Sequence, residues 1–574
     1  MKSKRRDFAC LGICAFGAAI IGAGAAHGQS APLSHNDPTR VTQAPTAPAA
    51  APLTLSQPTA AATPQDTASR FVLREVKFEG AGAVRQARLA PAWTAYRSRS
   101  VSLSDLRAIG HNAEAIYARA GFPFIAVLLK VQEVEDGVVD YDIVEGRISD
   151  LTIIGGDPAA RRQATAYLGP LVNRTPLSLG DVEGAYVTAR KVPGLGISGA
   201  LRRGETAGGM DLVVDARREE GRVYVNVNNL YANAVGPWGV LAGADYNGAS
   251  EFGDLTSAEV YTSVPVGRQV LIRASHEQGL DSQGLNATIS GLWGHANPQG
   301  DLSVLDLATD IEALRLEASQ PLWERPNSTL LATLAFDGSD QRTRVMRSAV
   351  LSDDKLRTFS AGLAGEITGA FGRLDATAEV RKGADFLGAS REGDANLSRV
   401  GGDPEALVFR GSLQAESAPI ARLLRLDVRI DAQQADHALT EPDQYSVGNL
   451  SIGRGYQPGQ ALGDSALGGA FEARIGPFPF GPLTAQPFAF YDDVRLWNHG
   501  VAPFRARTLS SVGGGVRLQV VNRFNVELTY AAPQRAPLGL GERTPSPTVL
   551  LNVTVGFGDV FAAIHRRLAS GAQQ

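Results

Sequence analysis

Residues 424–432 read LRLDVRIDA, and every second residue in this stretch is apolar. The five apolar positions alternate with two arginines and two aspartates. Because successive side chains of a β-strand point to opposite faces, this strand has one apolar face and one charged face. Strands of about ten residues with this alternation are typical of outer-membrane β-barrels, whose apolar face contacts lipid. A soluble antiparallel sheet can also show the pattern.

The same alternation recurs between about residues 222 and 557, for example over 313–318, 516–520 and 524–530. These roughly 336 residues contain no clear helical stretch, which favours the membrane barrel. Roughly 20 residues for each strand and its connection allow about 16 strands, within a range of about 14 to 18. After the N-terminal segment the chain has no run of 18 apolar residues. A membrane crossing therefore requires a closed antiparallel barrel.

A long loop, YSVGNLSIGRGYQPGQALGDSALGGAFE, occupies residues 445–472 between two such strands. Long loops inside compact domains are usually functional. This loop contains Arg454, Gly455 and Tyr456, and it resembles the Arg-Gly-Tyr loop of two-partner secretion transporters. These proteins form the haemolysin secretion/activation (ShlB/FhaC/HecB) family, within the larger superfamily of outer-membrane insertases and transporters. The resemblance selects 16 strands and implies that the loop folds back into the barrel.

The family resemblance also implies a partner for the loop arginine. PFAFYD at residues 487–492 resembles the family's Phe-x-Asp on the inner barrel wall, here Phe490 and Asp492. A planar guanidinium pairs bidentately with a carboxylate, so Arg454 is expected to donate to Asp492. Asp493 is a rival acceptor, although alternation points it outward. The chain has Gly453 where the family usually has valine, and Val494 where it has glycine.

Two α+β modules are expected before the barrel. In the first, a strand at 71–78, a capping box at 102–105, a helix over 103–120 and strands at 124–134 and 138–144 are predicted, with Asp136-Gly137 as the hairpin turn. The second has strands at 149–154, 197–202 and 210–216, and helices near 159–168 and 178–192. The β-α-α-β-β order resembles that of a ShlB-type polypeptide-transport-associated (POTRA) domain. Any small α+β domain is the alternative.

The N-terminus reads as a secretory signal peptide, with basic residues at 2–6 and an apolar run over 8–26. Both cysteines, Cys10 and Cys14, lie inside it, so the mature chain has no thiol. Residues 29–69 are rich in proline, alanine and threonine and are predicted to be a linker. The prolines argue against the plug helix that family members often carry ahead of this linker.

The composition points to neither a nucleic-acid partner nor an enzyme. Net charge is −4, and it becomes −7 without residues 1–28, which remove four basic residues and one acidic residue. Gly80-Ala81-Gly82 lacks the third glycine of a dinucleotide fingerprint, since position 85 is arginine. His276-Glu277 lacks a second histidine at metalloprotease spacing. No catalytic residue, metal or cofactor is expected.

These observations divide the chain into a signal peptide (1–28), a linker (29–69), two periplasmic POTRA modules (70–146 and 147–220) and an outer-membrane barrel with a C-terminal tail (221–574). The resemblance implies secretion of an unfolded partner polypeptide. No nucleotide site is visible in the sequence, so the driving force is expected to come from folding of that polypeptide outside. Outer-membrane lipid and the barrel-assembly machinery are the other expected partners. A membrane-protein insertase and a passive porin are the alternatives. The last strand is predicted at 549–557; residues 558–574 then form a periplasmic extension, unless that strand is misplaced by one residue.

Overall fold

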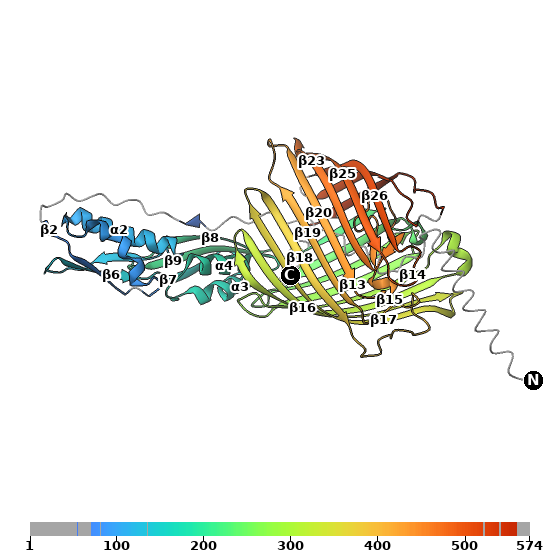
Figure 1. Cartoon of the computed structure of the whole chain (residues 1–574), viewed down its shortest axis with the longest axis horizontal. Coiled ribbons are helices and arrows are strands. Elements are labelled where there is room, and N and C mark those ends of the chain that lie inside the picture. Colours follow the sequence, from blue (N-terminus) through green and yellow to red (C-terminus); the bar gives the residue numbers. More distant parts are fainter. Residues whose placement is uncertain are drawn as a thin grey trace, which may run out of the picture.

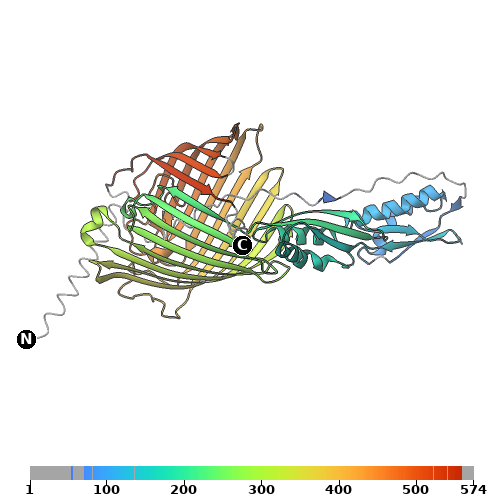
Figure 2. The ribbon, with the colours of Figure 1, turned by 180° about the vertical axis from the view of Figure 1, so that it is seen from behind.

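The computed structural model describes residues 54–55 and 70–558, apart from residues 81, 135, 521–522 and 539–540. The predicted signal peptide, most of the linker and the tail beyond residue 558 lie outside these residues. Two small α+β modules follow one another along the long axis and lead into a large closed barrel (Figure 1, Figure 2). The predicted order of modules and barrel is confirmed.

The first module has a three-stranded sheet with the order β3-β6-β5. Its elements are β2 (Phe71–Val72), β3 (Glu75–Glu79), β4 (Ser100–Val101), α2 (Leu103–Arg119), β5 (Ala126–Leu129) and β6 (Val138–Val144). The strand predicted at 71–78 is wrong in detail, because it divides into β2 and β3, which join different sheets. The strand predicted at 124–134 is shorter in the structure, where only β5 forms.

Helix α2 begins at the predicted capping box. Ser102 accepts a hydrogen bond from the Asp105 backbone N–H, and Asp105 accepts one from the Ser102 backbone N–H. The first helix of the β-α-α-β-β order is present only as three 3-10 turns, Gln86–Arg88, Ala90–Ala92 and Thr94–Tyr96. Pro91 lies in the middle one, and a proline is tolerated only in the first turn of a helix. A continuous α-helix is therefore disfavoured there.

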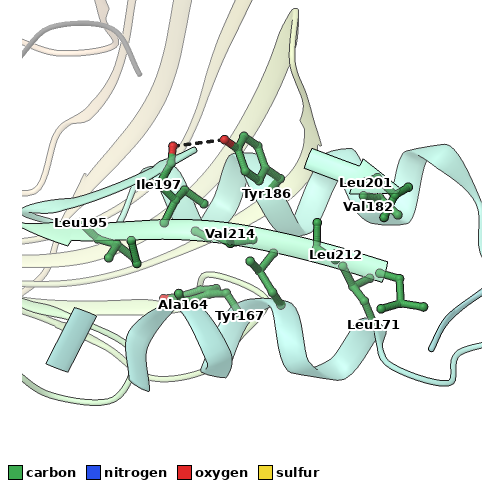
Figure 3. Packing of buried hydrophobic residues seen from close by; sticks show 14 of the residues in the cluster. Ala164, Tyr167, Leu171, Val182, Tyr186, Leu195, Ile197, Leu201, Leu212 and Val214 are labelled. Carbon is green, nitrogen blue, oxygen red and sulfur yellow. Dashed lines mark hydrogen bonds between the residues drawn. The ribbon is translucent and has the colours of Figure 1, made fainter. Parts of the chain in front are cut away.

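The second module follows the predicted order closely. It comprises β7 (Arg147–Ile154), α3 (Pro158–Leu168), α4 (Leu179–Arg190), β8 (Leu195–Arg203) and β9 (Gly209–Arg218). Its core lies between the two helices and the sheet, where Tyr186 donates a 3.1 Å hydrogen bond to the carbonyl of Ile197 (Figure 3). The outer edge of β8 pairs in parallel with β1 (Thr54–Leu55). These two residues lie in the predicted linker, which thus contains one short strand.

The barrel closes through 16 antiparallel strands, as predicted, because the last strand pairs with the first. In chain order the strands are β10 (Gly221–Asn228), β11 (Trp238–Asn247), β12 (Asp254–Val264), β13 (Gln269–Gly279), β14 (Asn286–Ala296), β15 (Ala308–Arg325), β16 (Ser328–Val345), β17 (Ala349–Gly369), β18 (Gly372–Gly383), β19 (Leu407–Ser417), β20 (Leu424–Ala435), β23 (Ser465–Ile475), β25 (Leu483–Trp497), β26 (Ala506–Val520), β27 (Phe524–Pro533) and β28 (Thr548–Gly556). A short strand, β24 (Phe478–Phe480), also pairs with β25.

Alternation along these strands separates an apolar outer face from a polar lumen. Leu426, Leu316 and Val549 are exposed on the outer face. The last strand ends at Gly556, one residue earlier than predicted, and the backbone N–H of Phe557 donates to the carbonyl of Val223. No helix in the described part of the chain is long and apolar enough to cross a membrane.

The second module contacts one rim of the barrel directly. Tyr167 on α3 donates a 2.9 Å hydrogen bond to the carbonyl of Phe252, and their rings pack edge to face. Burial, with nearby Asp281 and Glu277, raises the pKa of Tyr167 to about 12, so the hydroxyl keeps its proton. An ion pair between Lys191 and Glu324 lies at the same rim. These contacts hold the second module against this rim of the barrel.

Replacing Ser102 by alanine should weaken helix α2. The change removes the acceptor for the Asp105 N–H and should cost about 1 kcal/mol of stability in the first module. Hydrogen exchange of the intact protein in detergent should show faster exchange over residues 103–119. Ser178→Ala is the matched control, because the same box caps α4 in the second module. The Ser178→Ala variant should show faster exchange in α4. Unchanged exchange in α2 of the Ser102→Ala variant, while α4 of the Ser178→Ala variant exchanges faster, would contradict the prediction.

Candidate functional site

The loop after β20 forms a hairpin. Its strands β21 (Tyr445–Val447) and β22 (Ala461–Gly463) pair antiparallel, and the Arg-Gly-Tyr segment lies between them. Val447, Ile452, Tyr456 and Ala461 are buried against residues of β25 and β26 that face the lumen. The segment over residues 445–463, called the lumen loop below, is therefore packed inside the barrel.

Arg454 at the end of the hairpin donates to two carboxylates on the barrel wall. Its Nε and Nη2 donate to the two oxygens of Asp492 at 3.0 and 2.8 Å, and its backbone N–H donates to Asp492 at 2.9 Å. The guanidinium also lies 3.6 Å from the ring centroid of Phe490. Asp492 is only 1% exposed, so this contact is largely shielded from water. The structure thus brings together Arg454, Asp492 and Phe490, the three residues predicted to interact.

Asp493, the rival acceptor, points outward, where it accepts a hydrogen bond from Tyr491. Alternation along β25 explains the difference, because Phe490 and Asp492 share the buried inner face.

Glu472 on β23 is a wall residue that the sequence reasoning missed as a partner. It accepts from Nη1 of Arg454 at 2.8 Å and also from Arg474 and Arg517. Arg517 continues the network to Glu527 on β27. Alternation along β23 predicts that Glu472 lies on the inner face. Alternation alone does not predict which of several inward-facing carboxylates Arg454 contacts.

Tyr456 anchors the loop to the outer end of the wall. Its side chain is fully buried, and its hydroxyl lies 3.0 Å from the carbonyl of Ser510 and 2.8 Å from that of Arg535. The same oxygen accepts from the Arg535 N–H at 3.2 Å. The neighbouring Gly455 has φ +94°, and a Cβ there would lie 2.9 Å from Pro533 Cδ. Each residue of the motif therefore has a contact that requires it.

Gly453, one of the departures from the family pattern, also has a structural reason. Its φ is +115°, and a Cβ would lie 2.6 Å from Val447 Cγ1. A valine at this position would clash with the hairpin as it stands.

Comparison with known proteins agrees with this architecture. Residues 71–146 match the POTRA domain of ShlB type, and residues 282–518 match the haemolysin secretion/activation protein ShlB/FhaC/HecB. The chain belongs to the haemolysin secretion/activation (ShlB/FhaC/HecB) family. Together the two matches span more than half of the chain. Members of this family are outer-membrane transporters of two-partner secretion, with their POTRA domains in the periplasm.

Two solved structures share the fold. CdiB from Escherichia coli superposes with a TM-score of 0.73 at 17% identity, covering 88% of this chain and 94% of that chain. CdiB from Acinetobacter baumannii gives a TM-score of 0.63 at 14% identity, covering 88% of this chain and 95% of that one. No curated protein matches the sequence.

Arg454→Ala should release the lumen loop from the wall. The change leaves Asp492 and Glu472 without their loop donor, at a cost on the order of 3–5 kcal/mol, reduced by hydration of the lumen. Limited proteolysis of the purified barrel should then cleave within residues 445–463 faster than in the parent protein. Arg347→Ala removes an arginine that is 71% exposed on the rim and is the control. Equal cleavage in both variants would contradict the contact's role in holding the loop.

Tyr456→Phe should loosen the same loop less. The ring still fills its site, but the Arg535 N–H loses its acceptor, at a cost of about 1–3 kcal/mol. Hydrogen exchange should quicken at residues 453–457 and 535, while residues 472 and 492 keep their protection. Loss of protection on β23 and β25 would show that Tyr456 supports the wall as well as the loop.

Proposed function

We propose that the two modules capture the partner polypeptide by β-augmentation. One β-augmentation is present within the chain itself, because the edge of β8 pairs with the extended residues 54–55. Among the described residues, β5 in the first module pairs with β6 alone and β7 in the second pairs along its length with β9 alone. Both strands therefore offer main-chain groups to an extended segment, and main-chain recognition tolerates many sequences.

Residues 54–55 make one sheet edge, that of β8, a less favourable binding site for the client. They occupy the outer side of β8, so a client segment binding there would have to displace them. No described strand pairs along the outer edge of β5 or β7, where the chain's own contacts are fewer: the Val127 N–H of β5 donates to Glu114, and the Ile148 carbonyl of β7 accepts from Asn173. The first contact with the client is therefore assigned to β5 or β7.

The lumen loop then controls passage through the barrel. The observation that carries this proposal is the contact of Arg454 with Asp492 and Glu472, which holds the loop across the lumen. A polypeptide entering from the modules meets this loop, so the loop must shift for the polypeptide to thread outward. The porin alternative has no use for the modules, and the insertase alternative usually has a different or larger set of modules.

Biogenesis of the transporter calls for two further partners. Outer-membrane lipid would contact the exposed apolar face, which includes Leu334, Phe359 and Phe409. The barrel-assembly machinery would recognise the last strand, which presents Val549, Leu551, Val553 and Val555 on one face and is followed by Phe557.

Deleting the gene should remove one large protein from the medium and leave outer-membrane proteins unchanged. The expected cause is that a dedicated transporter serves one partner. Mass spectrometry of medium and outer-membrane fractions measures both. Complementation with Arg454→Ala should give normal barrel levels without secretion, and Arg347→Ala should restore secretion. A general fall in barrel proteins would instead identify an assembly factor.

A further inference from the structure

The lumen loop leaves part of the barrel interior open. A chamber of about 630 Å³ lies between the loop and the inner wall built by β13 to β20. Its wall carries both arginines and carboxylates, among them Arg315, Asp337, Glu379 and Arg381. Polar groups of both signs suit an extended polypeptide, whose main chain offers donors and acceptors alike.

The segment over residues 436–444 covers this chamber on the side away from the modules. It follows the outer end of β20, and Pro442, Asp443 and Gln444 line the chamber. Asp443 forms a 2.9 Å ion pair with Arg381 on the wall. An extended chain leaving the chamber outward would therefore meet this segment, called the cover below.

One buried ion pair fastens the cover to its neighbours. Asp464, at the base of the lumen loop, is fully buried and pairs with Arg399 of the 384–406 connection. Asp464 also accepts from the Leu439 backbone N–H at 3.0 Å, from Nε2 of Gln444 at 2.9 Å and from the His499 backbone N–H at 2.8 Å.

Arg399 also contacts the cover and the 498–505 connection. It donates to the carbonyl of Leu439 at 3.3 Å, to that of Val501 at 3.2 Å and to that of His499. The side chain is 9% exposed. Two further hydrogen bonds join the 384–406 connection to the cover, from the Glu441 N–H to Oγ of Ser398 and from the Asp403 N–H to the carbonyl of Ala438.

We infer that Arg399 and Asp464 form a latch that holds the extracellular exit closed, separate from the contact of Arg454. The latch joins the connections 384–406 and 498–505 and the cover around one buried charge pair. Opening the exit requires the cover to separate from both connections. The inference rests on the proposed function, because it concerns the route of the same client. Arg399 and Asp464 act by positioning the cover.

A reversible disulfide tests the latch. A Cβ built on Gly500 would lie 3.9 Å from the Cβ of Ala438, which is within the spacing of disulfides. The mature chain is expected to have no other cysteine, because both cysteines of the sequence lie at positions 10 and 14. Ala438→Cys combined with Gly500→Cys should therefore join the cover to the 498–505 connection in the oxidising environment outside the cell.

Secretion should be lost in the oxidised double variant and should return on treatment with a membrane-impermeant reductant. The single variants are controls for the substitutions themselves, including the strain at Gly500, whose φ is +59°. Val345→Cys with Ala349→Cys, facing positions of one outer hairpin, controls for the presence of a disulfide. Normal secretion from the oxidised Ala438→Cys/Gly500→Cys variant would overturn the latch and leave the proposed function intact. Absence of secretion from the parent protein would instead overturn the proposed function.

Arg399→Gln provides a second measurement that does not depend on the disulfide. It leaves the Asp464 carboxylate buried without its cation, so the cover should separate. Because Arg454 still holds the lumen loop across the barrel, Arg399→Gln is combined with Arg454→Ala, and cells carrying both changes at the parent's barrel level should be more sensitive than cells carrying Arg454→Ala alone to a large antibiotic that the outer membrane normally excludes. Arg347→Ala, on the same rim, is the control. Unchanged sensitivity would overturn the latch.

Discussion

A sheet that crosses a lipid bilayer has no water to satisfy the polar groups of its edge strands. Closure of β28 onto β10 removes both edges, and the rest of the molecule depends on it. Closure requires one face of every strand to be apolar and leaves the other face to line an enclosed space. The alternation in residues 424–432 is the consequence of this constraint at one strand. Charges that could not lie in lipid can therefore gather in the lumen, where many form ion pairs, as Arg315 does with Asp337.

The inner wall uses those charges to hold a loop. An unpaired Arg454 buried inside the barrel would cost desolvation free energy. Asp492 and Glu472 offset this cost, because their carboxylate oxygens accept hydrogen bonds from the guanidinium. Glu472 in turn lies among Arg474 and Arg517, so no carboxylate of this group is buried without a cation. A guanidinium suits this position better than an ammonium, because its fixed fork contacts two carboxylates at once while one face covers the ring of Phe490.

Sequence alone was sufficient for the barrel, the modules and the contact of Arg454 with Asp492, because these follow from period-two alternation, capping residues and a recognisable motif. Sequence reasoning failed where a proline or a contact with a distant residue determines the local structure. Pro91 disfavours the expected first helix, and 3-10 turns form there instead. Residues 54–55 pair with β8, which the composition of the linker did not predict. Glu472, Arg399 and Asp464 were missed for a different reason. Their partners lie 18, 65 and 65 residues away, and nothing in the spacing distinguishes them from other charged residues.

The lumen loop is held at two places by contacts of opposite polarity. At its tip the loop supplies the arginine and the wall supplies the carboxylates, whereas at its base the next residue, Asp464, supplies the carboxylate and the 384–406 connection supplies Arg399. Breaking a buried pair costs on the order of 3–5 kcal/mol, so opening both contacts together would be far less probable than opening either one. A client that first displaces the tip could therefore occupy the chamber while the cover still closes the exit. Until the cover opens, the barrel then presents no open path from the periplasm to the outside.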